Sequence, residues 1–235
     1  MHEIIPDNLS GNHNQIPGSK TVVSIPFQDF FLSAYLYLPE HPVALVLFSH
    51  GSGSSRFSPR NNYVAEILYR NNMVALLADL LTPKEDANIQ SRFNISLLTE
   101  RLKHLTQWSL QQPQFENLPI GYFGASTGAA SAINAAAFFG NQIKAVVSRG
   151  GRPDLATENA LESLTCPTLL IIGSLDDEVI TLNQKAFQEM KCTKQLEIVQ
   201  GASHLFEETG KLHAVSQLAE GWFEKYLVKS IVTEQ

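Results

Sequence analysis

The sequence predicts an α/β fold: a doubly wound, mostly parallel sheet with helices on both faces. Short, continuous apolar runs bounded by turn residues recur along the chain, as expected for strands buried on both faces. Segments with apolar residues at helical spacing lie between these runs, and this alternation is typical of parallel α/β folds. The length of 235 residues suits one domain of this kind.

The first part of the chain does not follow the alternation. Residues 1–19 are rich in Asn, Gly and Pro, so we expect a flexible arm there and a single domain over 20–230. Two β-rich stretches come next, Thr21–Phe27 and Phe31–Tyr37, joined by a short polar connection. They predict an antiparallel pair of strands at one edge of the sheet.

The apolar runs that follow are expected to form the parallel part of the sheet. Most are rich in β-branched or large aliphatic residues, and they cover Val43–Phe48, Met73–Ala78, Ile120–Phe123, Ala145–Val147, Thr168–Ile172 and Leu196–Val199. In open α/β sheets the ligand binds beyond the carboxyl ends of the strands. The residues after each run are therefore the candidates for function.

Helical patterns separate these runs. The first places Tyr63, Ile67 and Leu68 on one face, and a longer one ends before Pro113. The apolar stripe of this longer pattern consists of Leu97, Leu98, Leu102, Leu105 and Trp108. Further helices are predicted over Ala129–Phe139, Leu182–Met190 and Leu212–Leu227.

The composition is that of an ordinary globular protein, with 44% hydrophobic and 17% charged residues. The net charge is -6 and the basic residues are scattered, which argues against binding to nucleic acid or to an anionic membrane. The apolar runs are too short to cross a bilayer, and the polar N-terminus does not have the pattern of a signal peptide. We expect a cytoplasmic protein with neither nucleic acid nor membrane as a partner.

Cysteine and histidine usage gives little evidence of metal or redox chemistry. Cys166 and Cys192 are more simply interpreted as two unpaired thiols than as a disulfide. The seven histidines are spread along the chain, and no pair has the spacing of metal ligands. We expect neither a metal nor another cofactor.

The five residues GASTG, directly after the Ile120–Phe123 run, match G-x-S-x-G and place its serine at Ser126. In this motif the serine occupies a strained turn between strand and helix, and glycines relieve crowding where the two nearly touch. The pattern alone is equally compatible with a buried strand that runs into an alanine-rich helix. Its place between a predicted strand and a predicted helix favours a catalytic turn.

Two later strand ends carry an acid and a histidine. The segment GSLDDEV, after Thr168–Ile172, contains Asp176, and the segment GASHLF, after Leu196–Val199, contains His204. Taken singly, the first could be a solvated acidic loop and the second a structural histidine. Together with Ser126 they give the order serine, acid, histidine on loops after separate strands, which is the order of a Ser-His-Asp triad on this type of sheet.

The loop after Val43–Phe48, with the sequence SHGSGSSR, is rich in small residues. It matches neither phosphate-binding fingerprint, because it lacks G-x-x-x-x-G-K-[ST] and has Arg56 at the third glycine position of G-x-G-x-x-G. This argues against a nucleotide-binding Rossmann protein. Small residues allow backbone N–H groups to approach a carbonyl oxygen, as an oxyanion site requires, although a tight strand exit without a ligand would also explain them.

On the motifs HGSGSSR, GASTG, GSLDDEV and GASHLF, the sequence resembles the α/β-hydrolase superfamily, and in particular its dienelactone-hydrolase-like branch, over about residues 20 to 228. It also resembles small hydrolase modules that occur fused to a phosphoribosyltransferase-like domain. Dienelactone hydrolases use a cysteine nucleophile, whereas position 126 is serine. The resemblance therefore implies the α/β-hydrolase fold and a serine esterase-like reaction, and leaves the substrate open.

The resemblance also implies a role for each residue of the triad. Ser126 is expected to be the nucleophile and His204 its general base. Asp176 is expected to orient His204, with Asp177 as the alternative, and Glu178 to be exposed at the start of the following helix.

The expected oxyanion site consists of two backbone N–H groups. One belongs to Thr127, directly after the nucleophile, and the other to Ser52, with Gly53 as the next choice. His50 is expected to orient this loop without transferring a proton.

Arginines near the catalytic edge of the sheet suggest a negatively charged substrate. Arg149 and Arg152 follow the Ala145–Val147 run, and Arg56 and Arg60 follow the oxyanion loop. These side chains could bind a carboxylate or phosphate in bidentate fashion. Alternatively, they pair with nearby acids such as Asp79, Asp86 or Asp154.

The sequence thus predicts a serine hydrolase that cleaves a small ester or lactone through an acyl-enzyme, with an ester-type small molecule as its partner. A thioesterase, peptidase or acyltransferase of the same fold would share the triad, because loops set the substrate pocket. A binding protein of this fold without catalysis is a further alternative. No pattern in the sequence indicates an oligomeric state.

Overall fold

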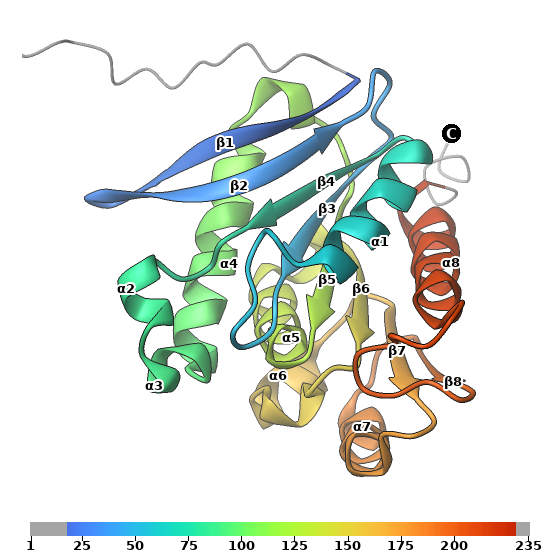
Figure 1. Cartoon of the computed structure of the whole chain (residues 1–235). Coiled ribbons are helices and arrows are strands. Elements are labelled where there is room, and N and C mark those ends of the chain that lie inside the picture. Colours follow the sequence, from blue (N-terminus) through green and yellow to red (C-terminus); the bar gives the residue numbers. More distant parts are fainter. Residues whose placement is uncertain (1–17, 229–235) are drawn as a thin grey trace, which may run out of the picture.

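The computed structural model describes residues 18–228, in which an eight-stranded mixed sheet lies between two layers of helices (Figure 1). The strand order across the sheet is β1-β2-β4-β3-β5-β6-β7-β8. The strands are β1 Ser19–Phe27, β2 Phe30–Leu38, β3 Ala44–Ser49, β4 Met73–Ala78, β5 Ile120–Ala125, β6 Ile143–Arg149, β7 Thr168–Gly173 and β8 Lys194–Val199. β1 pairs with β2 and β2 with β4 in antiparallel fashion, and all other neighbours are parallel.

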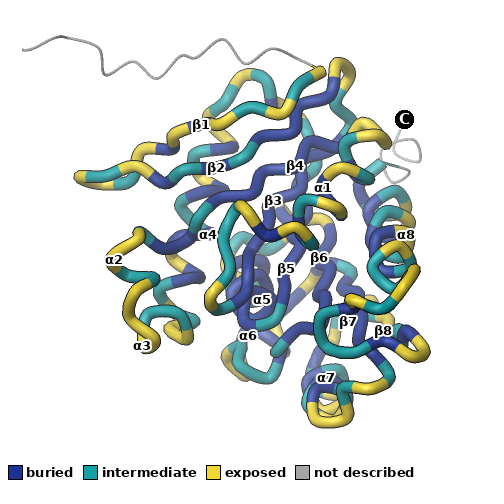
Figure 2. The backbone as a smooth tube through the Cα atoms, in the orientation of Figure 1, coloured by how far each residue is buried: buried dark blue, intermediate teal, exposed yellow. Residues whose placement is uncertain are grey.

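These pairings confirm the predicted fold class, with antiparallel strands at the N-terminal edge and a parallel sheet elsewhere. Strands β3, β4, β5 and β7 are buried at every position, as the continuous apolar runs predict (Figure 2). β8 lies at the other edge and is only half buried, because it has one neighbouring strand.

Helices cover both faces of the sheet. Their bounds are α1 Pro59–Arg70, α2 Pro83–Asp86, α3 Ile89–Arg92, α4 Ile95–Leu110, α5 Thr127–Phe139, α6 Glu158–Ser163, α7 Asp177–Glu189 and α8 Lys211–Phe223. Residues of α4, α5, α6 and α7 share one hydrophobic cluster, and residues of α1 and α8 share another. The two clusters lie on opposite faces of the central strands, since alternate residues of β3 belong to each.

The predicted buried face of the first helix is partly wrong. Leu68 of α1 is fully buried, but Tyr63 is exposed, and the residues that face the sheet are Val64, Ala65 and Leu68. The tyrosine hydroxyl instead forms a hydrogen bond of 3.2 Å with Nδ1 of His213 near the start of α8. An aromatic ring with a polar tip is well suited to this position at the rim of the core.

The short helices α2, α3 and α6 were not predicted. α2 and α3 have four residues each, and α6 has six, so none has the two turns over which an apolar stripe becomes visible. α7 begins at Asp177, five residues before the predicted Leu182, because its polar first turn gives no apolar pattern.

The predicted N-terminal arm, residues 1–19, lies outside the described residues except at its end, where Ser19 already belongs to β1. Cys166 and Cys192 are both free thiols. None of the helices between residues 18 and 228 is long and apolar enough to cross a membrane.

Candidate active site

Ser126 stands on a sharp turn between β5 and α5. Its backbone has φ 51° and ψ -124°, in a region that residues with a Cβ rarely adopt. Such a conformation costs about 1–3 kcal/mol and persists only where the surroundings enforce it. Every residue from Gly121 to Ala130 is buried except Ser126, so the turn brings this one side chain to the surface.

The two glycines of the GASTG motif allow this turn to form. A Cβ at Gly128 would lie 2.1 Å from the carbonyl oxygen of Ser49, and one at Gly124 would lie 2.6 Å from Cα of Ala129. Both distances are far below van der Waals contact. α5 can therefore start close to the ends of β3 and β5 only because these positions lack side chains.

His204 and Asp176 form a hydrogen bond across two strand-exit loops. Nδ1 of His204 lies 2.6 Å from Oδ2 of Asp176, and the two side chains are 37% and 16% exposed. A bonded Nδ1 leaves Nε2 as the free ring nitrogen. Asp177 is exposed as the first residue of α7, and Glu178 is exposed beside it. Of the two adjacent aspartates, Asp176 is thus the one that His204 contacts.

The loop after β6 links Ser126 to His204. The carbonyl oxygen of Arg149 accepts a hydrogen bond from the Ser126 N–H at 3.2 Å, and the N–H of Arg152 donates to the Ser126 carbonyl at 3.0 Å. Between them, a Cβ at Gly150 would lie 3.7 Å from Cε1 of His204. Ser126 and His204 therefore flank the same short loop. Within residues 18–228 no hydrogen bond joins their side chains directly, and catalytic hydrogen bonds often tighten only when a substrate is bound.

Further hydrogen bonds fix the loop that carries His204. The N–H of Leu175 donates to the carbonyl of Ala202 at 3.0 Å, which joins this loop to that of Asp176. The carboxylate of Glu208 accepts from the Ser203 N–H at 3.1 and 3.2 Å. The hydrogen bonds that the Glu208 carboxylate accepts, chiefly from Ser203, lower its pKa. Sequence reasoning missed Glu208, because an acid four residues after a histidine has no distinctive pattern.

The predicted oxyanion loop packs directly against Ser126. A Cβ at Gly51 would lie 2.9 Å from Cβ of Ser126 and 3.6 Å from its Oγ. The N–H of Ser52 donates to Oγ1 of Thr127 at 2.9 Å, so the two predicted oxyanion residues bond each other. Gly53 is exposed, with φ 65°, and lies beside the guanidinium of Arg92. The structure thus brings Ser52 and Thr127 together beside Ser126, whereas the neighbour of Gly53 is Arg92.

His50 ties this loop to the end of β4. Its Nε2 accepts from the Leu80 N–H at 3.0 Å, so the proton of the neutral ring is on Nδ1, which donates to the Gly51 carbonyl at 3.0 Å. Burial lowers the pKa of His50, against smaller opposing effects of the Gly51 hydrogen bond and of Asp79. A neutral imidazole with both nitrogens bonded is suited to holding the loop, as the sequence led us to expect.

The arginines that were candidates for substrate binding have partners within the protein. The guanidinium of Arg56 pairs with Asp79, and that of Arg152 with Asp154 through bonds of 2.8 and 2.9 Å. This is the alternative that the sequence left open. The Arg149 side chain is buried, where Nη2 donates to Asn61 at 3.0 Å, and burial lowers its pKa to about 10. The geometry therefore does not favour these three arginines as substrate ligands.

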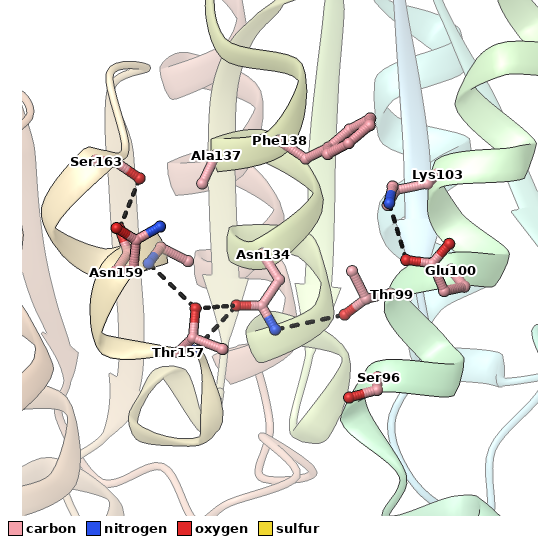
Figure 3. A pocket seen from close by; sticks show the side chains of 11 residues that line it. Ser96, Thr99, Glu100, Lys103, Asn134, Ala137, Phe138, Thr157, Asn159 and Ser163 are labelled. Atoms are coloured by element: carbon pink, nitrogen blue, oxygen red, sulfur yellow. Dashed lines mark hydrogen bonds and ion pairs between the residues drawn. The ribbon is translucent and has the colours of Figure 1, made fainter.

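Two surface grooves lie away from Ser126. One of about 340 Å³ lies between α4, α5 and α6, and Figure 3 shows Asn134 at its centre, bonded to Thr157 and Thr99. The other, of about 520 Å³, lies between Arg60 and Tyr63 of α1 and the residues from Phe206 to His213. Ser126 lines neither. Among residues 18–228, no group of three or more His, Cys, Asp or Glu side chains is placed to hold a metal ion.

The solved structure of the dienelactone hydrolase from Anabaena variabilis is similar to this chain. The two share 47% sequence identity and superpose with a TM-score of 0.85, over 89% of this chain and 98% of that chain. This chain belongs to the dienelactone-hydrolase-like branch of the α/β-hydrolase superfamily. A more distant member of the α/β-hydrolase fold, Est1E from Butyrivibrio proteoclasticus, shares 16% identity with a TM-score of 0.74 over 87% of this chain and 98% of that chain. At this identity the likeness concerns the fold alone.

Two curated proteins from strains of Mycobacterium tuberculosis, both named "Putative phosphoribosyl transferase", are also similar to this dienelactone-hydrolase-like chain. Each is 50% identical to it over 196 residues, which is 83% of this chain. The chain spans 44% of the length of these curated relatives. No family model matches the chain.

Proposed function

We propose that this chain is a serine hydrolase that cleaves a small carboxylic ester or lactone through an acyl-enzyme. The observation that carries the proposal is the hydrogen bond between Asp176 and His204, formed beside a loop that also holds Ser126. A carboxylate that orients an imidazole next to a hydroxyl is the arrangement that activates a weak nucleophile. The 47% identity to a dienelactone hydrolase supports a hydrolase.

In the proposed acylation, Nε2 of His204 takes the proton of the Ser126 hydroxyl while Oγ attacks the acyl carbon. The carbonyl π bond opens and places its electron pair on oxygen, giving a tetrahedral oxyanion. Asp176 stabilises the imidazolium that forms. When the carbonyl re-forms, the bond to the leaving oxygen breaks, and His204 returns its proton to that oxygen. An alcohol leaves, or in a lactone the ring opens.

Deacylation repeats these steps with water as the nucleophile. His204 takes a proton from water, the resulting oxygen attacks the acyl carbon, and the bond to Ser126 Oγ breaks. The imidazolium then protonates Oγ, which restores the enzyme and releases the acid. The N-terminus of α5 carries a partial positive charge that favours both oxyanions, because Thr127 is its first residue.

Exposed apolar side chains around the catalytic edge support an uncharged substrate with an apolar acyl group. Phe57 lies between β3 and α1, Ile89 and Phe93 lie in the segment between β4 and α4, and Leu175 lies in the loop after β7. Each is more than half exposed, and the carboxyl ends of these parallel strands meet at one edge of the sheet. Since Arg56 and Arg152 are engaged with aspartates, we expect neutral p-nitrophenyl esters to be cleaved faster than esters of dicarboxylic acids.

Labelling of Ser126 by a fluorophosphonate probe, together with hydrolysis of p-nitrophenyl esters, tests the proposal. We expect the wild type to be labelled and Ser126→Ala to lose both labelling and turnover. Asp176→Asn is expected to lower kcat by up to about 10⁴-fold, because the imidazole loses the partner that orients it. Asp177→Asn is the matched control, since its side chain is exposed next to Asp176, and it should retain wild-type kcat.

The outcomes separate the alternatives. A folded wild type that is neither labelled nor active would refute the proposal and favour a binding protein of this fold. Equal losses in the two aspartate variants would refute the assignment of Asp176. Labelling with turnover of thioesters or peptides, but not of oxygen esters, would retain the triad and change the substrate class.

A further inference from the structure

The Ser52 N–H is not free to bind a substrate oxyanion directly. It donates to Oγ1 of Thr127 at 2.9 Å. A backbone N–H has a single hydrogen, so a good hydrogen bond to one acceptor leaves little for a second. Of the two N–H groups expected to form the oxyanion site, that of Thr127 remains, because it belongs to the first residue of α5 and has no intrahelical acceptor.

The Thr127 hydroxyl has an unused hydrogen at the same place. Its oxygen accepts from Ser52, and no acceptor among residues 18–228 takes its hydrogen. The residue is 3% exposed and follows Ser126 directly in the chain. Because threonine is branched at Cβ, its side chain has few rotamers in a helix, and the bond from Ser52 selects among them. The hydroxyl is therefore held in position beside the nucleophile.

We propose that the Thr127 hydroxyl is a catalytic residue that donates a hydrogen bond to the oxyanion, alongside the Thr127 N–H. In this arrangement Ser52 is a positioning residue: its N–H orients the hydroxyl and, by donating to Oγ1, makes the hydroxyl a stronger donor. Both donors, the N–H and the hydroxyl, then belong to Thr127 at the start of α5, and Ser52 of the loop after β3 only positions the hydroxyl. This inference rests on the proposed serine hydrolase function.

If the Thr127 hydroxyl obstructed the oxyanion site and did not donate to it, removing the hydroxyl would change kcat in the opposite direction. If Oγ1 only obstructed the Ser52 N–H, removal of the hydroxyl would free that donor and accelerate the reaction. If the hydroxyl is a donor, its removal leaves the Ser52 N–H without its acceptor and takes one donor from the oxyanion. Removing one such donor typically lowers kcat by about 10²–10³-fold. The sign of the change in kcat therefore decides between the two roles.

Thr127→Val tests this, because valine keeps the shape and the backbone N–H but has no hydroxyl. We expect kcat for p-nitrophenyl acetate to fall by about 100-fold with KM within about twofold of wild type. Thr127→Ser, which restores a hydroxyl, should recover kcat to within about tenfold. The matched control is Thr106→Val, which removes the hydroxyl of a buried threonine that contacts Tyr122 in the core. It should leave kcat unchanged even if it lowers stability.

Wild-type or higher kcat in Thr127→Val would overturn the inference while leaving the proposed function intact. An inactive, unlabelled wild type would instead refute the proposed function itself, so the two failures are distinguishable. Circular dichroism and urea unfolding establish that each variant is folded. If Thr127→Val does not fold, Thr127→Ala against Thr127→Ser gives the comparison, and equal kcat in those two variants overturns the inference.

Discussion

At the scale of single residues, His50 shows how a buried polar side chain supports the site without acting in it. The imidazole is 4% exposed and joins the predicted oxyanion loop to the end of β4 through both nitrogens. A charged imidazolium has no acceptor available on Nε2, since the Leu80 N–H points at that atom. The folded protein therefore requires the neutral form.

This requirement makes stability depend on pH below about 6.5. Burial lowers the pKa of His50 in the folded protein from 6.5, so below that pH the unfolded chain binds a proton that the folded one does not. Stability is then present above 6.5 and lost as the pH falls, by about 1.4 kcal/mol per pH unit for one proton. Urea unfolding from pH 7 to 5.5 should show a steeper loss for wild type than for His50→Asn.

The exposed His41 supplies the control for this pH measurement. His41→Asn should keep the wild-type slope of unfolding free energy against pH. If His50→Asn also keeps that slope, protonation of His50 does not limit the acid stability of the fold.

How far the sequence predicts the site depends on the kind of interaction. Ser126, Asp176 and His204 could be located because each follows a recognisable strand, and the ends of parallel strands converge. The bond from Ser52 to the Thr127 hydroxyl could not be predicted, because it depends on side-chain orientation to within a few tenths of an ångström. The partners of Arg149 could not be predicted either. Asn61 lies 88 positions away on α1, whereas Arg149 ends strand β6, and the Asn61 amide has no charge to suggest the pairing.

At the scale of elements, strands and long helices were predictable from their apolar periods, whereas the segment from β4 to α4 was not. α2 is defined by local hydrogen bonds: Thr82 Oγ1 accepts from the Glu85 N–H at 3.2 Å, and Glu85 Oε2 accepts from the Thr82 N–H at 2.8 Å. This capping box satisfies the free donors of the first turn. A second carboxylate oxygen of Glu85 accepts from Arg101 of α4 at 2.6 Å.

Glu85→Gln should destabilise the fold through Arg101. The Arg101 guanidinium is nearly buried, and its Nε has no hydrogen-bond partner among residues 18–228, so it depends on the negative charge of Glu85. Partial burial acts to raise the pKa of Glu85, but the hydrogen bonds to Thr82 and the Arg101 charge together lower it below 4.5. The carboxylate thus stabilises the fold above pH 4.5, and the effect is lost as the pH falls through the folded pKa. We expect a loss of about 1–3 kcal/mol at pH 7, measured by urea unfolding, that shrinks toward pH 4.

Glu66→Gln is the matched control for Glu85→Gln. Glu66 pairs with Arg70 one turn along α1, and both side chains are more than half exposed. Such pairs contribute about 0.3–0.5 kcal/mol. If Glu66→Gln lowers the free energy of unfolding as much as Glu85→Gln does, the effect comes from removing a charge in general. It would then not come from the Glu85–Arg101 ion pair between α2 and α4.

At the scale of the whole molecule, the sheet separates two hydrophobic clusters and brings the loops of the proposed triad to one edge. The apolar runs predict which strands are buried, but not their order, since β4 lies between β2 and β3 although three strands precede it in the chain. That order depends on which strands the connecting helices join across the sheet, since α1 lies between β3 and β4 in the chain and α4 lies between β4 and β5. It places β3 beside β5, and so the oxyanion loop beside Ser126.

The cysteines offer a probe of the stability of this assembly. Cys166 is 4% exposed at the entrance of β7 and belongs to the cluster shared by α4, α5, α6 and α7. Burial, with a smaller effect of Cys192, raises the pKa of Cys166 to about 12, and burial also raises the pKa of Cys192. Only a thiolate reacts with Ellman's reagent, so native Cys166 is protected both by packing and by protonation.

In Cys192→Ser, where Cys166 alone remains, labelling with Ellman's reagent at pH 8 should be at least about 10³-fold slower in the native protein than in guanidinium. Because Cys166 packs in the cluster shared by α4, α5, α6 and α7, we expect its exposure to require these helices to separate from the sheet. In denaturant below the unfolding transition, the logarithm of the labelling rate should therefore rise in parallel with the fall in the free energy of unfolding. A rate that is independent of denaturant would show that Cys166 is reached by a local fluctuation of the loop before β7. Exposure of Cys166 would then not depend on cooperative unfolding of the two hydrophobic clusters.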